Sequence, residues 1–232
     1  MYEPVASTAP SRHPERARYD EATVHSILDE ALVGHLAFVA DGAPQLLPLL
    51  FVREGGSIYL HSSTGARPAR LAVRRRGLSV SFEVTLIDGL VLARSMFHHS
   101  VNYRSVVVHG TASMVADEAT KRRVLEQLVE KVAPGRSVDA RAPDRGELRQ
   151  TAMLELPLET VSAKVRAGDP VDDERDLASR CWAGVVRFSC ERRDPEPSAD
   201  LAAGIRVPAY LEPSAPDGAS ASRRRPARAA PA

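Results

Sequence analysis

The sequence predicts a mainly β protein, an antiparallel barrel of six or seven short strands with a few short helices around it. Two observations lead to this prediction. Short segments rich in Val, Leu, Ile and Phe alternate with tight-turn signals such as Asp41-Gly42, a favoured two-residue hairpin turn. Helical periodicity occurs only in short, separate segments. The strands are therefore joined mainly by hairpins, which argues against a doubly wound parallel sheet.

Three segments are predicted to be helices. In residues 21–32, apolar side chains recur at helical spacing, and Asp20 stands where an N-cap is expected. Residues 118–132 repeat this pattern after Asp117. The third segment, residues 64–76, is rich in arginine with few apolar members, and is predicted to be a short helix.

The remaining apolar segments are predicted to be strands. Asp88-Gly89, like Asp41-Gly42, is expected to reverse the chain as a hairpin turn. Pro48 lies inside the second strand. Because proline cannot donate to a ladder, this stretch is expected at an edge, at a bulge or against a ligand. The expected strands are residues 34–40, 44–53, 57–62, 78–86, 90–95, 103–115 and 151–166.

The composition argues against several classes of protein. The 232-residue chain has a formal net charge of +1, which gives no sign of a nucleic-acid-binding surface or of a strongly acidic partner. We expect no secretory signal, and no apolar run approaches the ~20 residues of a membrane helix, so a cytoplasmic protein is expected. Cys181 and Cys190 are expected to be free thiols in that setting, although a disulfide between them stays open.

One folded domain with extended ends is expected. Residues 1–18 are polar and contain prolines, which predicts a flexible N-terminal arm. Residues 19–190 hold the predicted strands and helices. The chain then becomes rich in Pro, Ala, Ser and Arg, so we expect an extended segment over residues 191–212 and a disordered tail over residues 213–232.

The first candidate ligand site lies where the third expected strand leads into the arginine-rich helix. Ser62 and Ser63 are followed within a few residues by Arg67 and Arg70. The backbone N–H groups and the dipole at a helix start favour an anion, and hydroxyl and guanidinium groups add donors. The segment therefore suits a phosphate. A capped helix with solvated arginines is the alternative explanation of the same pattern.

The second candidate is the segment 94–105, where polar, aromatic and basic residues stand between two expected strands. Loops positioned by a barrel often hold ligands. His98 and His99 are adjacent, but neighbours in a chain usually point to different sides and no third ligand is suitably spaced, so no metal is expected. A polar loop that satisfies its own backbone is the alternative.

Trp182, the only tryptophan, is the third candidate, because it follows the last expected core strand. It suits covering a ligand or a dimer partner, and it equally suits anchoring the C-terminal segment. No nucleophile elbow, P-loop, dinucleotide-binding glycine pattern or zinc motif is present. If the protein is an enzyme, the chemistry is therefore expected from a cofactor, and no catalytic residue is singled out.

Taken in order, these segments resemble the flavin-nucleotide-binding branch of the pyridoxamine 5'-phosphate oxidase-like superfamily, which contains the 5-nitroimidazole-resistance proteins. The similarity runs from about Tyr19 to about Trp182, and its most specific pieces are YLHS (residues 59–62) and HHSVNYRSVVV (residues 98–108). The resemblance implies a split β-barrel that binds FMN and a small-molecule substrate. It also implies a homodimer with the flavin near the subunit interface.

The resemblance further implies which residues meet the cofactor. The FMN phosphate would lie at the start of the arginine-rich helix and the flavin ring along the second strand. Part of the segment 94–105 would approach the ring or the ribityl chain, and Trp182 would reach the flavin of the other subunit. The implied residues are Leu47, Pro48, Leu49, Leu50, Ser62, Ser63, Arg67, Arg70, Asn102, Tyr103, Ser105 and Trp182.

The function expected from this resemblance is that of an FMN-dependent oxidoreductase. Its acceptor would be a small organic molecule such as a nitro compound or a quinone, with Arg104 or one of His98 and His99 stabilising the reduced flavin. The C-terminal residues with which true pyridoxamine 5'-phosphate oxidases hold their substrate phosphate are not found. Oxidation of pyridoxamine phosphate is therefore not expected.

Two alternatives remain open at this point. The first is a non-catalytic flavin- or haem-binding protein, because neutral imidazole is a normal haem ligand; the candidates are His61, His98, His99 and His109. The second is a reductase that uses the deazaflavin F420, whose longer phosphate tail needs a basic groove. Such a groove could be supplied by Arg67, Arg70, Arg74, Arg75 and Arg76.

Overall fold

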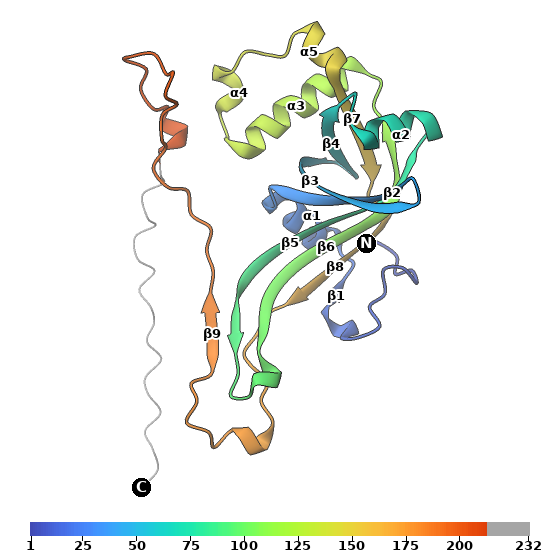
Figure 1. Ribbon diagram of the computed structural model, residues 1–232. Helices are drawn as coiled ribbons and strands as arrows, with labels where there is room; N and C mark the ends of the chain where they lie inside the picture. Colours follow the sequence, from blue (N-terminus) through green and yellow to red (C-terminus); the bar gives the residue numbers. More distant parts are fainter. Residues whose placement is uncertain (213–232) are drawn as a thin grey trace. The chain divides into compact units, whose positions relative to one another are not determined.

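The computed structural model describes residues 1–212 and divides the chain into two units, Met1–Ser189 and Cys190–Ala232. The expected disordered tail over residues 213–232 lies outside the described residues. All the strands found in residues 1–212 belong to the first unit (Figure 1). They are β1 (Ala17–Arg18), β2 (Val33–Ala40), β3 (Ala43–Glu54), β4 (Ser57–Ser63), β5 (Leu78–Leu92), β6 (Ser100–Met114), β7 (Thr151–Pro157), β8 (Thr160–Arg166) and β9 (Gly184–Arg187).

Five α-helices accompany the strands in the described part of the chain: α1 (Glu21–Glu30), α2 (Arg67–Arg75), α3 (Glu118–Val132), α4 (Arg136–Asp139) and α5 (Arg145–Gln150). Asp20 and Asp117 cap α1 and α3, since their side chains accept from the backbone N–H of the third helical residue. The short helices α4 and α5, between α3 and β7, were not among the three predicted helices. No helix of the described residues is long and apolar enough to cross a membrane.

Six of the strands close into a barrel. In ring order β2 pairs with β3, β3 with β4, β4 with β7, β7 with β6, β6 with β5, and β5 again with β2, and every pairing is antiparallel. The other three strands extend this ring at its sides. The expectation of a mainly β, antiparallel barrel with peripheral helices is confirmed.

Strands β5 and β6 form one long hairpin that continues beyond the barrel (Figure 1). Its far part pairs with β9 on one side and with β8 on the other. The predicted turn at Asp88-Gly89 is wrong, since β5 runs straight through it with only a register shift between Ile87 and Gly89. Because β6 pairs with β5 on both sides of this point, the Asp88-Gly89 segment forms a bulge and not a turn.

The last expected strand, 151–166, is divided into β7 and β8, which follow one another in the same direction and both pair antiparallel with β6. Leu158 and Glu159 separate the two strands, and the Leu158 N–H donates to the carbonyl of Gly56 at 2.8 Å. Both halves are rich in apolar residues, so the sequence pattern alone did not reveal the break. The break matters because β7 pairs with β4 in the barrel, whereas β8 continues along β6 into the extension.

The N-terminal residues pack against the barrel, which differs from the expected flexible arm. Thr8 is buried, Tyr2 packs against the core and its hydroxyl lies 2.9 Å from His25 Nε2. The Tyr19 hydroxyl donates to the Thr8 carbonyl at 3.1 Å. The two residues of β1 pair with β8. These contacts fix the position of the segment before α1.

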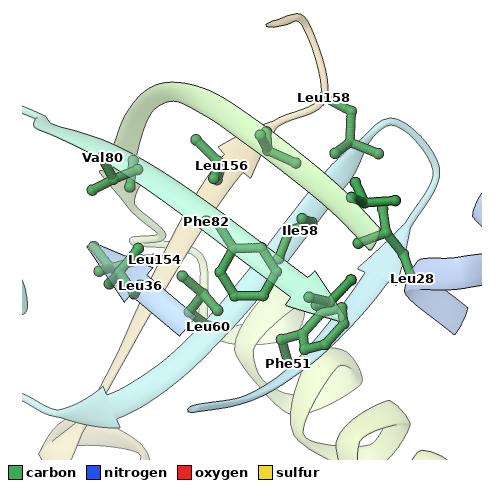
Figure 2. Close-up of a cluster of buried hydrophobic side chains, with 14 of the residues drawn as sticks. Leu28, Leu36, Phe51, Ile58, Leu60, Val80, Phe82, Leu154, Leu156 and Leu158 are labelled. Atoms are coloured by element: carbon green, nitrogen blue, oxygen red, sulfur yellow. The ribbon is translucent and has the colours of Figure 1, made fainter. Parts of the chain in front are cut away.

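The core fills the barrel and is closed at one side by α1, which contributes Val24, Ile27 and Leu28. Phe51 and Phe82 meet edge to face, with ring centroids 4.9 Å apart and planes at 67°. Side chains from five barrel strands converge around them (Figure 2). Those labelled in the figure include Leu36, Ile58, Leu60, Val80, Leu154 and Leu156.

Helix α3 covers the outside of the barrel with a second cluster, in which Val124 and Leu128 pack with Tyr59 and Met153. At its C-terminal end, the Lys131 ammonium donates to the Leu28 carbonyl at 2.9 Å and lies 3.8 Å from the centre of the Phe51 ring. Burial lowers the pKa of Lys131 to about 8. The Lys131 side chain of α3 therefore contacts both α1 and the barrel core.

Gly34 on β2 is required by the packing of Phe82. A Cβ built at this position would lie 2.0 Å from Phe82 Cζ. We expect Gly34→Ala to lower the free energy of unfolding by about 1–3 kcal/mol, because the ring has no free space to move into. Urea denaturation followed by circular dichroism measures this change.

Gly56→Ala is the matched control, since a Cβ at Gly56 meets nothing within 4 Å. We expect this control to match the parent chain or to exceed its stability slightly, through the lower entropy of the unfolded chain. Equal unfolding free energies for the two variants would contradict the packing argument.

Candidate functional site

The site begins where β3 separates from β4. The two strands pair only from Phe51 to Glu54, with Phe51 opposite Leu60. Before Phe51, β3 remains paired with β2, and beyond Leu60, β4 remains paired with β7. Two strand edges therefore face each other here without a shared ladder, and their unpaired backbone groups are available to a ligand.

Leu47, Pro48, Leu49 and Leu50 all lie on β3 along this open edge, as the sequence predicted. Leu47 and Leu49 turn inward and pack against the core, whereas Pro48 and Leu50 are exposed on the outer side. Pro48 pairs with His35 of β2 on the strand's other edge. Its missing N–H is tolerated because β3 needs only one complete ladder at this point.

Helix α2 starts at the end of β4 without a side-chain cap. Its N-cap residue is Ala66, and no side chain accepts from the first turn. The Arg67 guanidinium lies 3.4 Å from Gln45 Oε1 on β3, and Ser63 Oγ accepts from the Gly65 N–H at 3.1 Å. The geometry thus brings Ser62, Ser63 and Arg67 to the open edge of β3.

The charge at this helix start favours an anion. The first turn of α2 has no acidic residue, and the positive end of the helix dipole is uncapped. Arg67 is half-exposed, and its nearest carboxylate is that of Asp41, 3.8 Å away. Arg70 follows one turn later on the same helix and is exposed. The predicted phosphate site is therefore consistent with the local geometry.

The outward side chains of β3, β2, β5 and β6 form a continuous surface, which we call the open sheet face. One row across it is Leu46, Ala37, Ser81 and His109. The next row is Pro48, His35, Glu83 and Val107. The large apolar residues on this face are unusually exposed, at 47% for Val33, 54% for Val39 and 63% for Leu46.

Two histidines lie on this face, and a third candidate, His61, lies on β4. His109 Nδ1 is 2.8 Å from Ser81 Oγ, and His35 Nδ1 is 3.6 Å from a carboxylate oxygen of Glu83. His61 on β4 has a buried Nδ1 without a hydrogen-bond partner in the described residues. Burial lowers the pKa of His61 and favours its neutral ring. The sequence analysis singled out His61 and His109 and missed His35.

The segment 94–105 forms the far end of the β5–β6 extension. The backbone N–H and the guanidinium of Arg94 each donate to Asp172 at 2.8 Å. Burial opposes ionisation of Asp172, but the bonds from Arg94 outweigh it and hold the pKa of Asp172 below its ordinary value. His98 and His99 are engaged with Asp173 and with the Ser95 carbonyl. Sequence reasoning missed Asp172, because the contact spans 78 residues.

Asn102, Tyr103 and Ser105 lie on β6 in this extension. Asn102 is buried, and its amide donates to the Gly168 carbonyl at 3.0 Å and accepts from Arg166. The Ser105 hydroxyl donates to the Lys164 carbonyl at 3.4 Å. The structure therefore groups these residues with β8, and not with the start of α2 in the same chain.

Arg104, which was expected near a reduced flavin, forms ion pairs with two carboxylates in this structure. Its guanidinium donates to Glu30 at the end of α1 and to Asp88 in the bulge. The hydrogen bonds that Arg104 donates to these two carboxylates raise its pKa above its ordinary value. The Arg104 side chain thus links β6 to the end of α1 and to β5 where the extension leaves the barrel.

Trp182 is 64% exposed just before β9. Its indole ring lies against Gly184, where an added Cβ would come within 2.9 Å of the ring. Since β9 pairs with residues 89–92 of β5, Trp182 belongs to the extension. Both cysteines are exposed free thiols. Within residues 1–212, no three His, Cys, Asp or Glu side chains gather in a way that could hold a metal ion.

Comparison with known proteins identifies the family and the fold. A family model described as pyridoxamine 5'-phosphate oxidase matches residues 20–165. The structure of the flavocytochrome Anf3 from Azotobacter vinelandii is similar at 34% identity and a TM-score of 0.83, over 91% of this chain and 97% of that one. The comparison with curated proteins gave no match.

Two further solved structures are similar. The FAD and haem binding protein from Mycobacterium smegmatis shares 33% identity, over 84% of this chain and 95% of that one, at a TM-score of 0.78. A 5-nitroimidazole antibiotic resistance protein from Bacteroides thetaiotaomicron shares the fold at 20% identity and a TM-score of 0.54, over 64% of this chain and 86% of that one. The chain has the split-barrel fold and belongs to the pyridoxamine 5'-phosphate oxidase family.

Proposed function

We propose that this protein is a flavin- and haem-binding redox protein. The observation that carries the flavin part is the uncapped, arginine-lined start of α2 beside the open edge of β3. The haem part is supported by the two most extensive similarities described above, to a flavocytochrome and to an FAD and haem binding protein. Both of those proteins are covered almost completely by this chain.

The flavin phosphate would be held by Ser62, Ser63, Arg67 and the free N–H groups of α2, with Arg70 one turn away. The flavin ring would lie along Leu47 to Leu50, where unpaired backbone groups of β3 face its polar edge. A bound flavin accepts and passes on a hydride or two electrons. The role of the chain is to fix the phosphate, orient the ring and shield one side of it with Pro48 and Leu50.

FMN and FAD share the ring, the ribityl chain and the first phosphate, so the site described suits either one. We propose FAD, because the similar M. smegmatis protein is an FAD and haem binding protein. The acceptor we propose is a small organic molecule such as a nitro compound or a quinone. The alternatives from the sequence, FMN and F420, are distinguished when the released chromophore is identified.

For haem, His109 on the open sheet face is the axial ligand we favour. Ser81 Oγ can accept from its Nδ1–H, which would direct an unprotonated Nε2 away from Ser81. In the same row Ala37 and Ser81 are small, and Leu46 beyond them is exposed and apolar. Such a face suits a flat apolar ring. His61 is the second candidate, because its buried Nδ1 is unpartnered in the described residues.

We also propose that the protein is a homodimer in which the flavin lies near the subunit interface. Val33, Val39, Leu46 and Leu50 are exposed side by side on β2 and β3, and a contiguous apolar patch of this kind marks an interaction surface. A second copy would cover it. Asn102, Tyr103, Ser105 and Trp182 lie apart from the α2 cradle in one chain, so a partner's extension is how they would reach a flavin.

The phosphate site can be tested with Arg67→Gln. We expect the variant to lose about tenfold or more in affinity for FAD and FMN, since one charge-assisted hydrogen bond to the phosphate is removed. Its affinity for riboflavin, which has no phosphate, should be unchanged. Fluorescence titration measures all three, and Arg74→Gln in the last turn of α2 is the matched control. An equal loss for riboflavin would contradict the assignment.

The cofactors themselves can be read from the visible spectrum of protein purified without additions. We expect oxidised flavin bands near ~375 and ~450 nm together with a haem Soret band. The Soret band should disappear in His109→Ala. If it disappears in His61→Ala instead, the ligand assignment is wrong, and if haem added to the parent chain never gives the band, the haem part of the proposal fails.

The dimer can be tested with Leu46→Glu, which places a charge in the apolar patch. We expect the parent chain to have the mass of a dimer in light scattering and the variant that of a monomer with unchanged circular dichroism. Val73→Glu is the control, because Val73 is equally exposed, at 64%, but lies on α2. A monomeric parent chain would refute the proposed interface.

A further inference from the structure

A basic recess lies between the segment before β1 and the end of β8. It is separate from the predicted phosphate site at the start of α2. It encloses about 470 Å³, which is within the range of small-molecule sites. Arg16 and Arg18 line it from the N-terminal side, and Arg166 lines it from β8. The pairing of β1 with β8 sets these residues against each other, with Arg18 opposite Ala163.

The guanidinium groups of this recess are only partly neutralised. Arg18 Nη1 donates to the carbonyls of Glu15 and Ala17, both at 2.7 Å, and Arg166 donates to the side chain of Asn102. In the described part of the chain, neither of these two arginines has a carboxylate within ion-pair distance. Arg16 lies 3.7 Å from Glu15, which is itself well exposed.

The electrostatics of the recess also point to an anion. Burial lowers the pKa of Arg166, and the nearby positive charge of Arg16 lowers it further. Two like charges held beside a partly dry cavity repel each other. An anion with several oxygen atoms would relieve this repulsion and accept the remaining N–H groups of the guanidinium forks.

The rest of the wall is mixed: Glu15 and Asp169 add two carboxylates to the three arginines, and the other lining residues are apolar or small. Val165, Pro170 and Val171 line the recess, and Val171 is 75% exposed at its rim. Arginines beside an apolar surface match a ligand that has both a phosphate group and a flat, weakly polar ring. We propose that the recess binds a nucleoside diphosphate, with its phosphates on Arg16, Arg18 and Arg166 and its base against Pro170 and Val171.

Two sources would supply this group, namely the nucleotide half of a flavin dinucleotide and a separate dinucleotide that donates electrons. Binding of ADP itself does not depend on the flavin proposal, because it is measured on the chain after all cofactor has been removed. A lack of ADP binding in the recess and a lack of flavin binding at the start of α2 are therefore detected in different titrations.

The test is calorimetric titration of the full chain with ADP, adenosine and inorganic pyrophosphate at low salt. We expect ADP to bind more tightly than either fragment. Arg16→Gln should weaken ADP about tenfold or more. This variant loses only a long contact to Glu15, so an unchanged melting temperature is expected. Arg166→Gln should have the same effect on ADP.

The control is Arg145→Gln on α5, outside the recess, which should bind ADP like the parent chain. The proposal is overturned if ADP does not bind, if the two recess variants bind it normally, or if pyrophosphate binds as tightly as ADP. Titration of reconstituted chain then identifies the source. Loss of ADP binding with FAD but not with FMN assigns the recess to the flavin nucleotide, and binding with both assigns it to a separate dinucleotide.

Discussion

The architecture depends on where the β3–β4 ladder ends. Before Phe51 on β3 and beyond Leu60 on β4, the two strands pair with different partners, and this divergence lets a six-stranded ring close while one seam stays open. The edge-to-face contact of Phe51 with Phe82 fills the barrel directly behind that seam, and α2 starts beside it. The same constraint therefore shapes the core, exposes the backbone of β3 and positions the cradle that suits a phosphate.

Local signals in the sequence were sufficient for much of the fold. Asp20 and Asp117 cap the helices that were predicted after them, because capping depends on neighbours within one turn. Pro48 correctly indicated a strand with one incomplete ladder. Ser62, Ser63 and Arg67 were recognised as a unit for the same reason, since the end of a strand, a turn and a helix start are adjacent in the chain.

Contacts between distant residues account for what the sequence could not provide. Asp88-Gly89 is a turn by every local criterion, yet pairing with β6 on both sides keeps β5 continuous. Thr8 and Tyr2 are docked by Tyr19 and His25, and nothing in a polar, proline-containing segment indicates such partners. The pairing of Ser81 with His109 and the approach of Arg16 to Arg166 likewise appear only once the strands are in register.

The bulge has a consequence for how such a protein can vary in evolution. A one-residue shift in an antiparallel ladder sends each side chain to the opposite face, and here the shift is confined to the point where the extension leaves the barrel. Loss of Asp88 would remove the bulge and leave a regular ladder in which Gly89 still pairs with Asn102 and Val91 with Ser100, so neither Val91 nor Phe82 would change face. The gain or loss of this one residue is thus absorbed where the extension leaves the barrel, and the side chains on both sides of it keep their faces.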